Sequence, residues 1–259
     1  MTDVISPWRP DVRRLTAEFV GTAFLLAAVV GSGIMAETLS TDVGLQLLQN
    51  AFATAGVLTA LILTFGAVSG AHFNPAVTVT DRVFGGLDTP TAVWYVISQT
   101  LGGIVGVIVA NVMFDLDPVD WSTKDRSAAN LVFAESVATL GLLLVIFGVV
   151  RSQRVSVVAF AVGGYIAGAY YFTSSTSFAN PAVTVARMFS DTFAGIEPAS
   201  APAFIAGQFA AVAVAIGLIK VLWPDIDEVA DEVLAPHETT RSAPEGVEES
   251  VTTTDAGVP

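Results

Sequence analysis

Cysteine is absent from this 259-residue sequence, and only 14% of the residues are charged. Without cysteine the chain has no disulfides, no thiolate nucleophile and no thiolate metal site. Two histidines, His72 and His237, are too few for a histidine-rich metal site. No nucleophile is paired with a base along the chain, which argues against an enzyme, so we expect no catalytic residue.

Basic residues are also scarce: 11 Lys and Arg face 24 Asp and Glu, a formal charge of -13. Most of this imbalance lies near the end of the chain, because residues 225–255 contain ten acidic residues and one arginine. Such a polar stretch is too poor in apolar runs to build a core. We therefore predict that residues 224–259 form a disordered acidic tail on the cytoplasmic side, and we expect no nucleic-acid partner.

What the sequence has in abundance is apolar residues, at 53% with a mean hydropathy of +0.67. About 20 helical residues cross the ~30 Å of hydrocarbon in a bilayer. Runs of that length predict an all-α integral membrane protein with six transmembrane helices, near residues 15–36, 45–67, 91–114, 129–150, 155–177 and 201–223. Residues 1–14, which end in "WRPDVRR", are expected to be a cytoplasmic segment before a retained first span, since no signal-peptide cleavage site follows.

Short loops with many Lys and Arg residues mark the cytoplasmic side of a membrane protein. On one side of the predicted spans lie Arg9, Arg13, Arg14, Arg82, Arg151, Arg154 and Lys220. Lys124, Arg126 and Arg187 lie on the other side, among several aspartates. We therefore expect a multi-pass protein of the cell membrane with both termini in the cytoplasm.

The string Asn-Pro-Ala-Val-Thr-Val occurs twice, at residues 74–79 and 180–185. Each copy belongs to a longer series, because "AEFVGT" at 17–22 and "AESVAT" at 134–139 open the two halves, and Gln99 and Gln208 follow the two strings. Each half, about 15–114 and about 129–223, holds three spans, so the second half enters the membrane from the opposite face. This is an inverted repeat, whose transport site typically lies near the membrane midplane.

Asparagine followed by proline starts a helix, because Asn caps the first free N–H groups and proline at the next position needs no hydrogen-bond acceptor. The segments after Asn74 and Asn180 continue for only about ten residues, enough for half the membrane. Two re-entrant half-helices from opposite faces meet at their positive ends. Such dipoles oppose cations and protons in a pore, and we expect the two Asn amides to donate hydrogen bonds into the lumen.

At these residues the chain resembles the major intrinsic protein family, the aquaporins and aquaglyceroporins, from about Arg13 to Trp223. "SGAHFNPAVT" at 69–78 and the paired Ala-Glu openings add to the resemblance. It implies an aquaporin-like channel domain over residues 15–223, a homotetramer in the lipid bilayer with one pore per subunit, passive conduction of water and small neutral solutes, and no cofactor. The pore motifs are then Asn74, Pro75, Ala76, Asn180, Pro181 and Ala182.

The sequence departs from the family directly after the second motif, where most members carry an arginine and this chain carries Val183. The family's spacing assigns the rest of the selectivity filter to Thr54, Gly168 and Ser177. A ring of these four residues is wide and weakly polar, so we predict glycerol and similar solutes as substrates. Neutral metalloid hydroxides such as arsenite are the alternative, and an ion-coupled secondary transporter is a more remote one.

Several polar residues have more than one interpretation. Glu18 and Glu135 either bind protons, as in coupled carriers, or anchor the re-entrant loops, as the family implies; Gln99 and Gln208 are anchors or solute ligands. His72 lines the pore or is only packed. Arg187 lies one turn beyond Val183 and has three interpretations: it supplies positive charge at the outer mouth, it pairs with Asp191, or it lies at a subunit interface.

Overall fold

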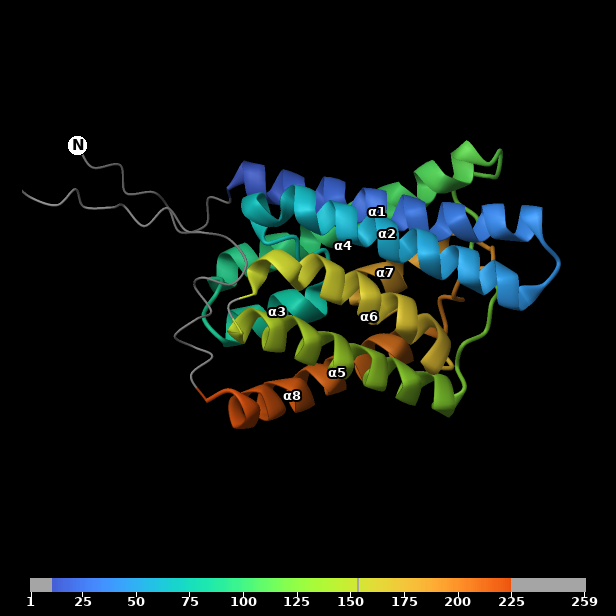
Figure 1. The fold of residues 1–259 in the computed structure, drawn as a ribbon. Coiled ribbons are helices and arrows are strands. Elements are labelled where there is room, and N and C mark those ends of the chain that lie inside the picture. Colours follow the sequence, from blue (N-terminus) through green and yellow to red (C-terminus); the bar gives the residue numbers. More distant parts are fainter. Residues whose placement is uncertain (1–10, 153, 225–259) are drawn as a thin grey trace, which may run out of the picture.

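The computed structural model describes residues 11–152 and 154–224, and every element in them is helical. Six long helices run side by side along one axis (Figure 1). They are α1 (Val12–Leu39), α2 (Val43–Ser69), α4 (Thr89–Met113), α5 (Ala129–Arg151), α6 (Val158–Phe172) and α8 (Ala201–Leu222). Two short helices, α3 (Pro75–Val83) and α7 (Pro181–Ala186), lie among them, and η1 (Val155–Val157) and η2 (Arg187–Phe189) are single 3₁₀ turns.

Five of the long helices, all except α6, are long and apolar enough to cross a membrane. The sixth, α6, has 15 residues and ends at Phe172, so the expected span over 155–177 is too long by several residues. The helix ends where "TSSTS" (173–177) begins, and the Thr173 hydroxyl donates to the Ala169 carbonyl at 2.6 Å. Ser and Thr side chains compete in this way with the helical backbone, which frees residues 173–180 to form a loop.

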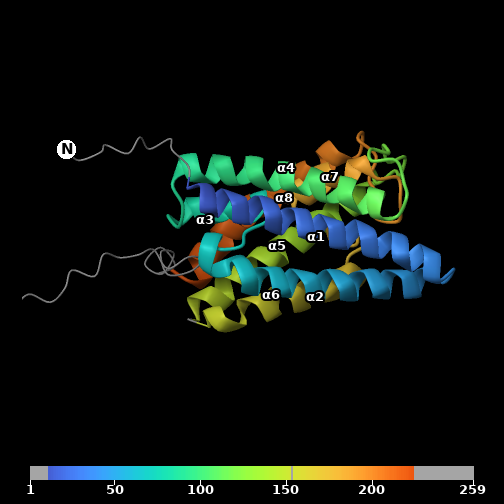
Figure 2. The same ribbon diagram turned by 90° about the horizontal axis from the view of Figure 1, so that it is seen from above.

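The helix contacts show the inverted repeat. α1 packs against α2 and α4, and in the second half α5 packs against α6 and α8. Each half-helix contacts the last long helix of both halves, since α3 lies against α4 and α8, and α7 lies against α8 and α4. In both views α3 lies towards the end of the bundle where the described chain begins, and α7 lies towards the opposite end (Figures 1 and 2).

Glycines allow the closest of these helix pairs. A side chain at Gly102 or Gly106 of α4 would collide with the carbonyl oxygens of Phe19 and Ala23 on α1. Gly163 of α6 similarly lies against Thr59 of α2. Small residues bring helix backbones together in membranes, so these positions hold the frame around the half-helices.

The two ends of the described chain lie at the same end of the bundle, because α1 begins and α8 finishes there (Figure 1). This is what an even number of long helices requires. Residues 225–259 of the predicted tail and residues 1–10 of the predicted N-terminal segment lie outside the described residues.

Candidate functional site

The N-termini of the two half-helices meet in the middle of the bundle. Asn74 caps α3 by accepting from the Ala76 N–H at 2.9 Å, and Asn180 caps α7 by accepting from Ala182 and Val183 at 2.9 and 3.2 Å. Pro75 and Pro181 occupy the first position of each helix. The sequence predicted this start for both helices, because Asn-Pro combines a cap with a preset backbone angle.

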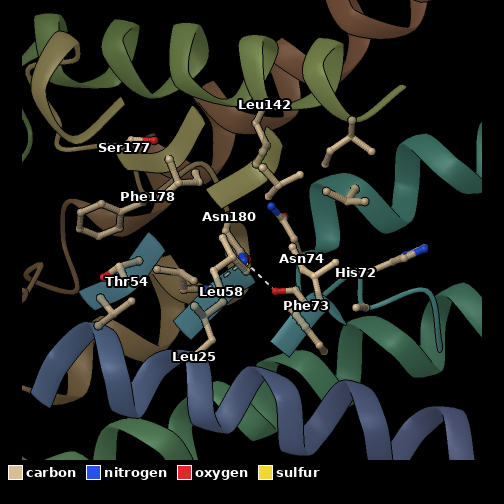
Figure 3. A pocket seen from close by; sticks show the side chains of 18 of the residues that line it. Leu25, Thr54, Leu58, His72, Phe73, Asn74, Leu142, Ser177, Phe178 and Asn180 are labelled. Carbon is tan, nitrogen blue, oxygen red and sulfur yellow. Dashed lines mark hydrogen bonds between the residues drawn. The ribbon is translucent and has the colours of Figure 1, made fainter. Parts of the chain in front are cut away.

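Each asparagine also reaches across to the other half of the molecule. Asn74 Nδ2 donates to the Ala179 carbonyl at 2.8 Å. Asn180 Nδ2 donates to the Phe73 carbonyl at 2.7 Å, the bond drawn in Figure 3. One N–H of each amide is therefore used to join the two loops, a role that the sequence did not predict. The second N–H of each has no protein acceptor among the described residues, and both side chains line the cavity described below.

The backbone leading into each half-helix has the same unusual conformation in the two repeats. Ala71 and Phe73 have φ of 49° and 48°, and Ser177 and Ala179, at the matching positions, have φ of 52° and 47°. A residue with a side chain in the left-handed region costs about 1 to 3 kcal/mol and persists only when its surroundings hold it there. Between these positions, His72 and Phe178 do not have positive φ. Because positive φ alternates with ordinary φ along each loop, successive carbonyl and N–H groups point to opposite sides of the loop.

A buried glutamate holds each loop in this shape. Glu18 Oε1 accepts from the His72 N–H at 3.0 Å and from the Ser69 hydroxyl at 2.6 Å, and Oε2 accepts from the Phe73 N–H at 2.8 Å. Gln99 Nε2 donates to the same Oε2 at 2.8 Å and to the Thr78 hydroxyl at 2.9 Å. These contacts are the ones expected of a loop anchor, and they occupy both oxygens of the carboxylate.

The second repeat reproduces the arrangement. Glu135 accepts from the Phe178 and Ala179 N–H groups at 2.9 and 2.8 Å. Gln208 Nε2 donates to Glu135 at 2.8 Å and to Thr184 at 2.9 Å. Gln99 and Gln208 are themselves fully buried and do not line the cavity. The geometry thus matches the anchoring interpretation of both glutamines.

A cavity passes the point where the half-helices meet (Figure 3). About 80 Å³ of it is open to water-sized molecules, room for several waters or one small solute. Its wall is mostly aliphatic, with Leu25, Leu58, Leu142 and Ile146 among the residues that line it, and the polar groups are few. Thr54, Ser177 and Phe178 lie at one end, His72 lies at the other, and the two asparagines lie between them.

Three of the four predicted filter residues, Thr54, Ser177 and Val183, line the cavity at the end nearest α7, but Gly168 does not. Gly168 is exposed, and a side chain there would meet nothing within 4 Å. α6 presents Val158, Val162, Ile166 and Tyr170 to the cavity, and a residue two positions from Tyr170 lies on the opposite face of a helix with 3.6 residues per turn. The prediction of Gly168 is therefore wrong, and Tyr170, hydrogen-bonded to Thr54 at 3.1 Å, occupies the ring instead.

His72 lines the cavity near α3 and is buried at the same time. Its Nδ1 lies 3.0 Å from the Thr78 hydroxyl, and its Nε2 lies 3.8 Å from Asp81 Oδ2. The edge of the imidazole also packs against Tyr95, with ring centroids 5.4 Å apart. His72 is therefore a packed, hydrogen-bonded ring that also forms part of the cavity wall, and it is not only a packing residue.

Arg187 also lines the cavity, just beyond α7, and is 2% exposed. Its Nε donates to the Ala194 carbonyl, and its guanidinium carbon lies 3.4 Å from the centroid of the Phe178 ring. The expected pairing with Asp191 is wrong, because Asp191 accepts from Thr123 instead, at 2.9 Å from its N–H. Arg187 lies inside the protomer, which also excludes an exposed position at a subunit interface.

Two further cations lie near Arg187, in the loop between α4 and α5. Arg126 donates to the Gly195 and Ser175 carbonyls at 2.9 and 3.2 Å and lies 4.9 Å from the Phe178 centroid. Burial, and after it the positive charges of Arg126 and Arg187, lower the pKa of Lys124 to about 8. Three cations, Lys124, Arg126 and Arg187, are therefore gathered beside the cavity at its α7 end. Residues 11–152 and 154–224 contain no group of three or more His, Asp or Glu side chains that could hold a metal ion.

Comparison with known proteins agrees with this geometry. Residues 7–157 match the family model described as major intrinsic protein. The chain is 45% identical over 210 residues to an aquaglyceroporin, AqpS, of Rhizobium meliloti, covering 81% of this chain and 90% of the relative. It is 32% identical to nodulin-26 of Glycine max, over 90% of this chain and 84% of that protein. The fold is similar to the crystal structure of an aquaglyceroporin from Plasmodium falciparum, with a TM-score of 0.64, 21% identity, and coverage of 84% of this chain and 99% of the other.

Proposed function

The chain belongs to the major intrinsic protein family, and from this premise we propose that it is a passive membrane channel for water and small neutral solutes such as glycerol. The observation that carries this proposal is the cavity running past the two capped half-helices, with asparagine amides as its central polar groups. A mostly aliphatic wall with a few hydrogen-bonding groups suits a neutral hydroxylated molecule, which exchanges some of its water contacts for these groups.

Cations and protons are opposed at the centre. Each half-helix N-terminus carries roughly half a positive charge, and the caps of both helices lie at the same point in the cavity. A neutral solute has no net charge for this field to repel, so the barrier acts on charge rather than on size.

The details of the ring near α7 favour solutes larger than water. Val183 leaves open the space that an arginine would fill, although Tyr170 makes the ring narrower than four small residues would. Glycerol is the solute we propose first. Neutral metalloid hydroxides such as arsenite present the same hydroxyl groups and are the second candidate.

An ion-coupled carrier is disfavoured by the glutamates. Glu18 and Glu135 are the acids buried among the spans at the re-entrant loops, and their oxygens accept hydrogen bonds from backbone N–H groups and glutamines. A carboxylate engaged in this way is not open to a coupling proton from the cavity. Because family members are channels, we also propose that the chain has no catalytic activity.

We place the protein in the cell membrane as a homotetramer with both termini in the cytoplasm. The positions of Lys and Arg along the chain support this orientation, as does the meeting of both described ends at one end of the bundle. α2 exposes large apolar side chains, including Phe52 at 80% and Leu63 at 56%, a surface for lipid or for neighbouring subunits.

Solute flux into proteoliposomes tests the function. Water, glycerol, urea and arsenite should enter at rates that stay linear well above millimolar concentration and that ignore proton and sodium gradients. Saturation together with ion dependence would indicate a carrier, and an absence of flux for all four solutes from correctly inserted protein would overturn the proposal.

A further inference from the structure

The wall of the cavity near α7 contains one cation, and it lies at an unexpected place. Arg187 comes four residues after Val183, so the two side chains follow one another along the same side of the half-helix and its 3₁₀ extension. Both line the cavity. The guanidinium thus stands one turn farther towards the α7 end than a residue at position 183 would.

The surroundings of Arg187 fix its position without using all its hydrogen-bond donors. The Nε N–H is taken by the Ala194 carbonyl, and the flat face lies on the Phe178 ring. Within the described chain the two terminal nitrogens have no hydrogen-bonded acceptor, and no carboxylate lies within ion-pair distance of them. Arg187 is also a residue of the cavity wall, so these two nitrogens are its candidate donors to a molecule in the cavity.

Arg126 provides a contrast in the same cluster. It stacks near the same Phe178 ring, at 4.9 Å, but two backbone carbonyls accept from its guanidinium and it is absent from the cavity wall. Its contacts describe a side chain that fastens the loop. Of the two arginines, Arg187 is the one that combines an anchored guanidinium with a place in the cavity wall.

We propose that Arg187 is a selectivity residue of the channel, which supplies the positive charge and the solute-facing donors of the outer constriction from one turn beyond Val183. This inference rests on the channel function proposed above. An arginine at position 183 would both narrow the ring and supply a positive charge. Here Val183 leaves the ring wide, and Arg187 supplies the charge in the wall one turn beyond it. The solutes it selects are small and neutral, larger than water, with oxygen acceptors for the guanidinium.

A comparison of charges indicates that Arg187 opposes cations more strongly than the N-termini of the half-helices do. Each half-helix contributes about half a unit of positive charge, spread over free N–H groups that also bond the capping asparagines. The guanidinium carries a full unit, has no carboxylate partner in the described chain and lies in a mostly aliphatic wall, where charge is poorly screened. Its removal should therefore affect cations far more than neutral solutes.

Guanidinium and urea make a matched pair of probes, since they have the same planar shape and differ by one charge. In proteoliposomes, Arg187→Met should raise the ratio of guanidinium to urea permeability at least tenfold, about 1.4 kcal/mol of barrier. Arg187→Lys keeps the charge and should keep the low ratio. Arg126→Met, the control, removes a cation of the same cluster that does not line the cavity and should leave the ratio within about twofold.

The outcomes separate the possibilities. A wild type that conducts urea, together with assembled Arg187→Met that keeps the wild-type ratio, would overturn this inference and leave the channel function intact. The same rise in Arg126→Met as in Arg187→Met would also overturn it, because loop structure would then be the cause. If Arg187→Met does not assemble, Arg187→Gln decides by the same ratio, whereas a wild type without urea, glycerol or water flux contradicts the channel function itself.

Discussion

Residue 183 sets how much room the cavity has near α7. Val183 is 5% exposed and lines the wall next to Tyr170 and Ser177. A branched aliphatic side chain here fills little space and offers no donor. The ring therefore depends on Thr54, Tyr170 and Ser177 for polar contacts.

Replacing Val183 with arginine should make the channel more selective for water over glycerol. The added guanidinium narrows the ring, so we expect the ratio of glycerol to water permeability to fall at least tenfold, about 1.4 kcal/mol of barrier. Stopped-flow measurements on proteoliposomes give both rates. Val183→Met, which adds length without charge, should lower the ratio much less, and assembly must be checked because a buried arginine is costly without carbonyl partners. An unchanged ratio in assembled Val183→Arg would mean that the narrowest part lies elsewhere.

The central asparagines give the second prediction. In Asn74→Asp or Asn180→Asp a negative charge stands where two positive helix ends meet, so cation current should rise above wild type. The carboxylate still caps the helix, but it loses the N–H that Ala179 or Phe73 accepts. Asn111→Asp is the control, since Asn111 also donates to a carbonyl, that of Phe189 at 2.9 Å, but does not line the cavity. If neither variant carries more current than this control, the central barrier is not at the asparagines.

Among the elements, the pair formed by α1 and α4 depends on the absence of side chains. A methyl group at Gly106 would meet the Ala23 carbonyl, which is part of a helix backbone and cannot rotate away. We expect Gly106→Ala to lower stability by about 1 to 3 kcal/mol, as overpacking does, measured by thermal unfolding in detergent. Gly217→Ala in α8, where nothing lies within 4 Å, should be neutral or stabilise by up to about 1 kcal/mol through helix propensity. Equal effects at the two glycines would contradict the packing argument.

The re-entrant loops depend on their glutamates in a similar way. In Glu18→Gln one acceptor oxygen becomes an amide that faces N–H donors, and each buried donor left without a partner costs about 1 to 3 kcal/mol. The yield of assembled protein should fall, and Glu135→Gln in the other repeat should behave alike. Purified Glu18→Gln that assembles should still conduct, at a rate that does not respond to a proton gradient. A wild-type flux that follows the proton gradient, and that no longer follows it in Glu18→Gln, would identify a carrier.

The sequence predicted what depends on local chemistry. Asn-Pro predicted both half-helices, and the length of the apolar runs predicted the long helices. The repeat of Glu and Gln around the two motifs led us to propose loop anchors, a proposal that the hydrogen bonds of Glu18 and Glu135 support. It was wrong about Gly168, because the rotation of α6 is set by its packing on α2, where Gly163 meets Thr59. The crossed bonds from Asn74 to Ala179 and from Asn180 to Phe73 join residues more than a hundred positions apart, so no local pattern announces them.

For the whole molecule, the acidic tail gives the last prediction. Its charge is near -9, ten acids and one arginine, and its lack of apolar periodicity suggests a segment that stays in water. Deleting the residues after Asp227 should leave water and glycerol permeability unchanged in proteoliposomes. A large loss of flux with normal insertion would show instead that the tail gates the pore.

The crossed asparagine bonds bear on how such a channel changes during evolution. At the centre, the asparagine of each repeat donates a hydrogen bond to a backbone carbonyl of the other repeat. A substitution there therefore disturbs both repeats. At the α7 end, Thr54, Tyr170, Ser177 and Val183 come from separate elements, and single changes alter the opening without touching those bonds. New solute preferences can therefore arise at the mouth by single substitutions, whereas a change at the centre needs compensation in both halves.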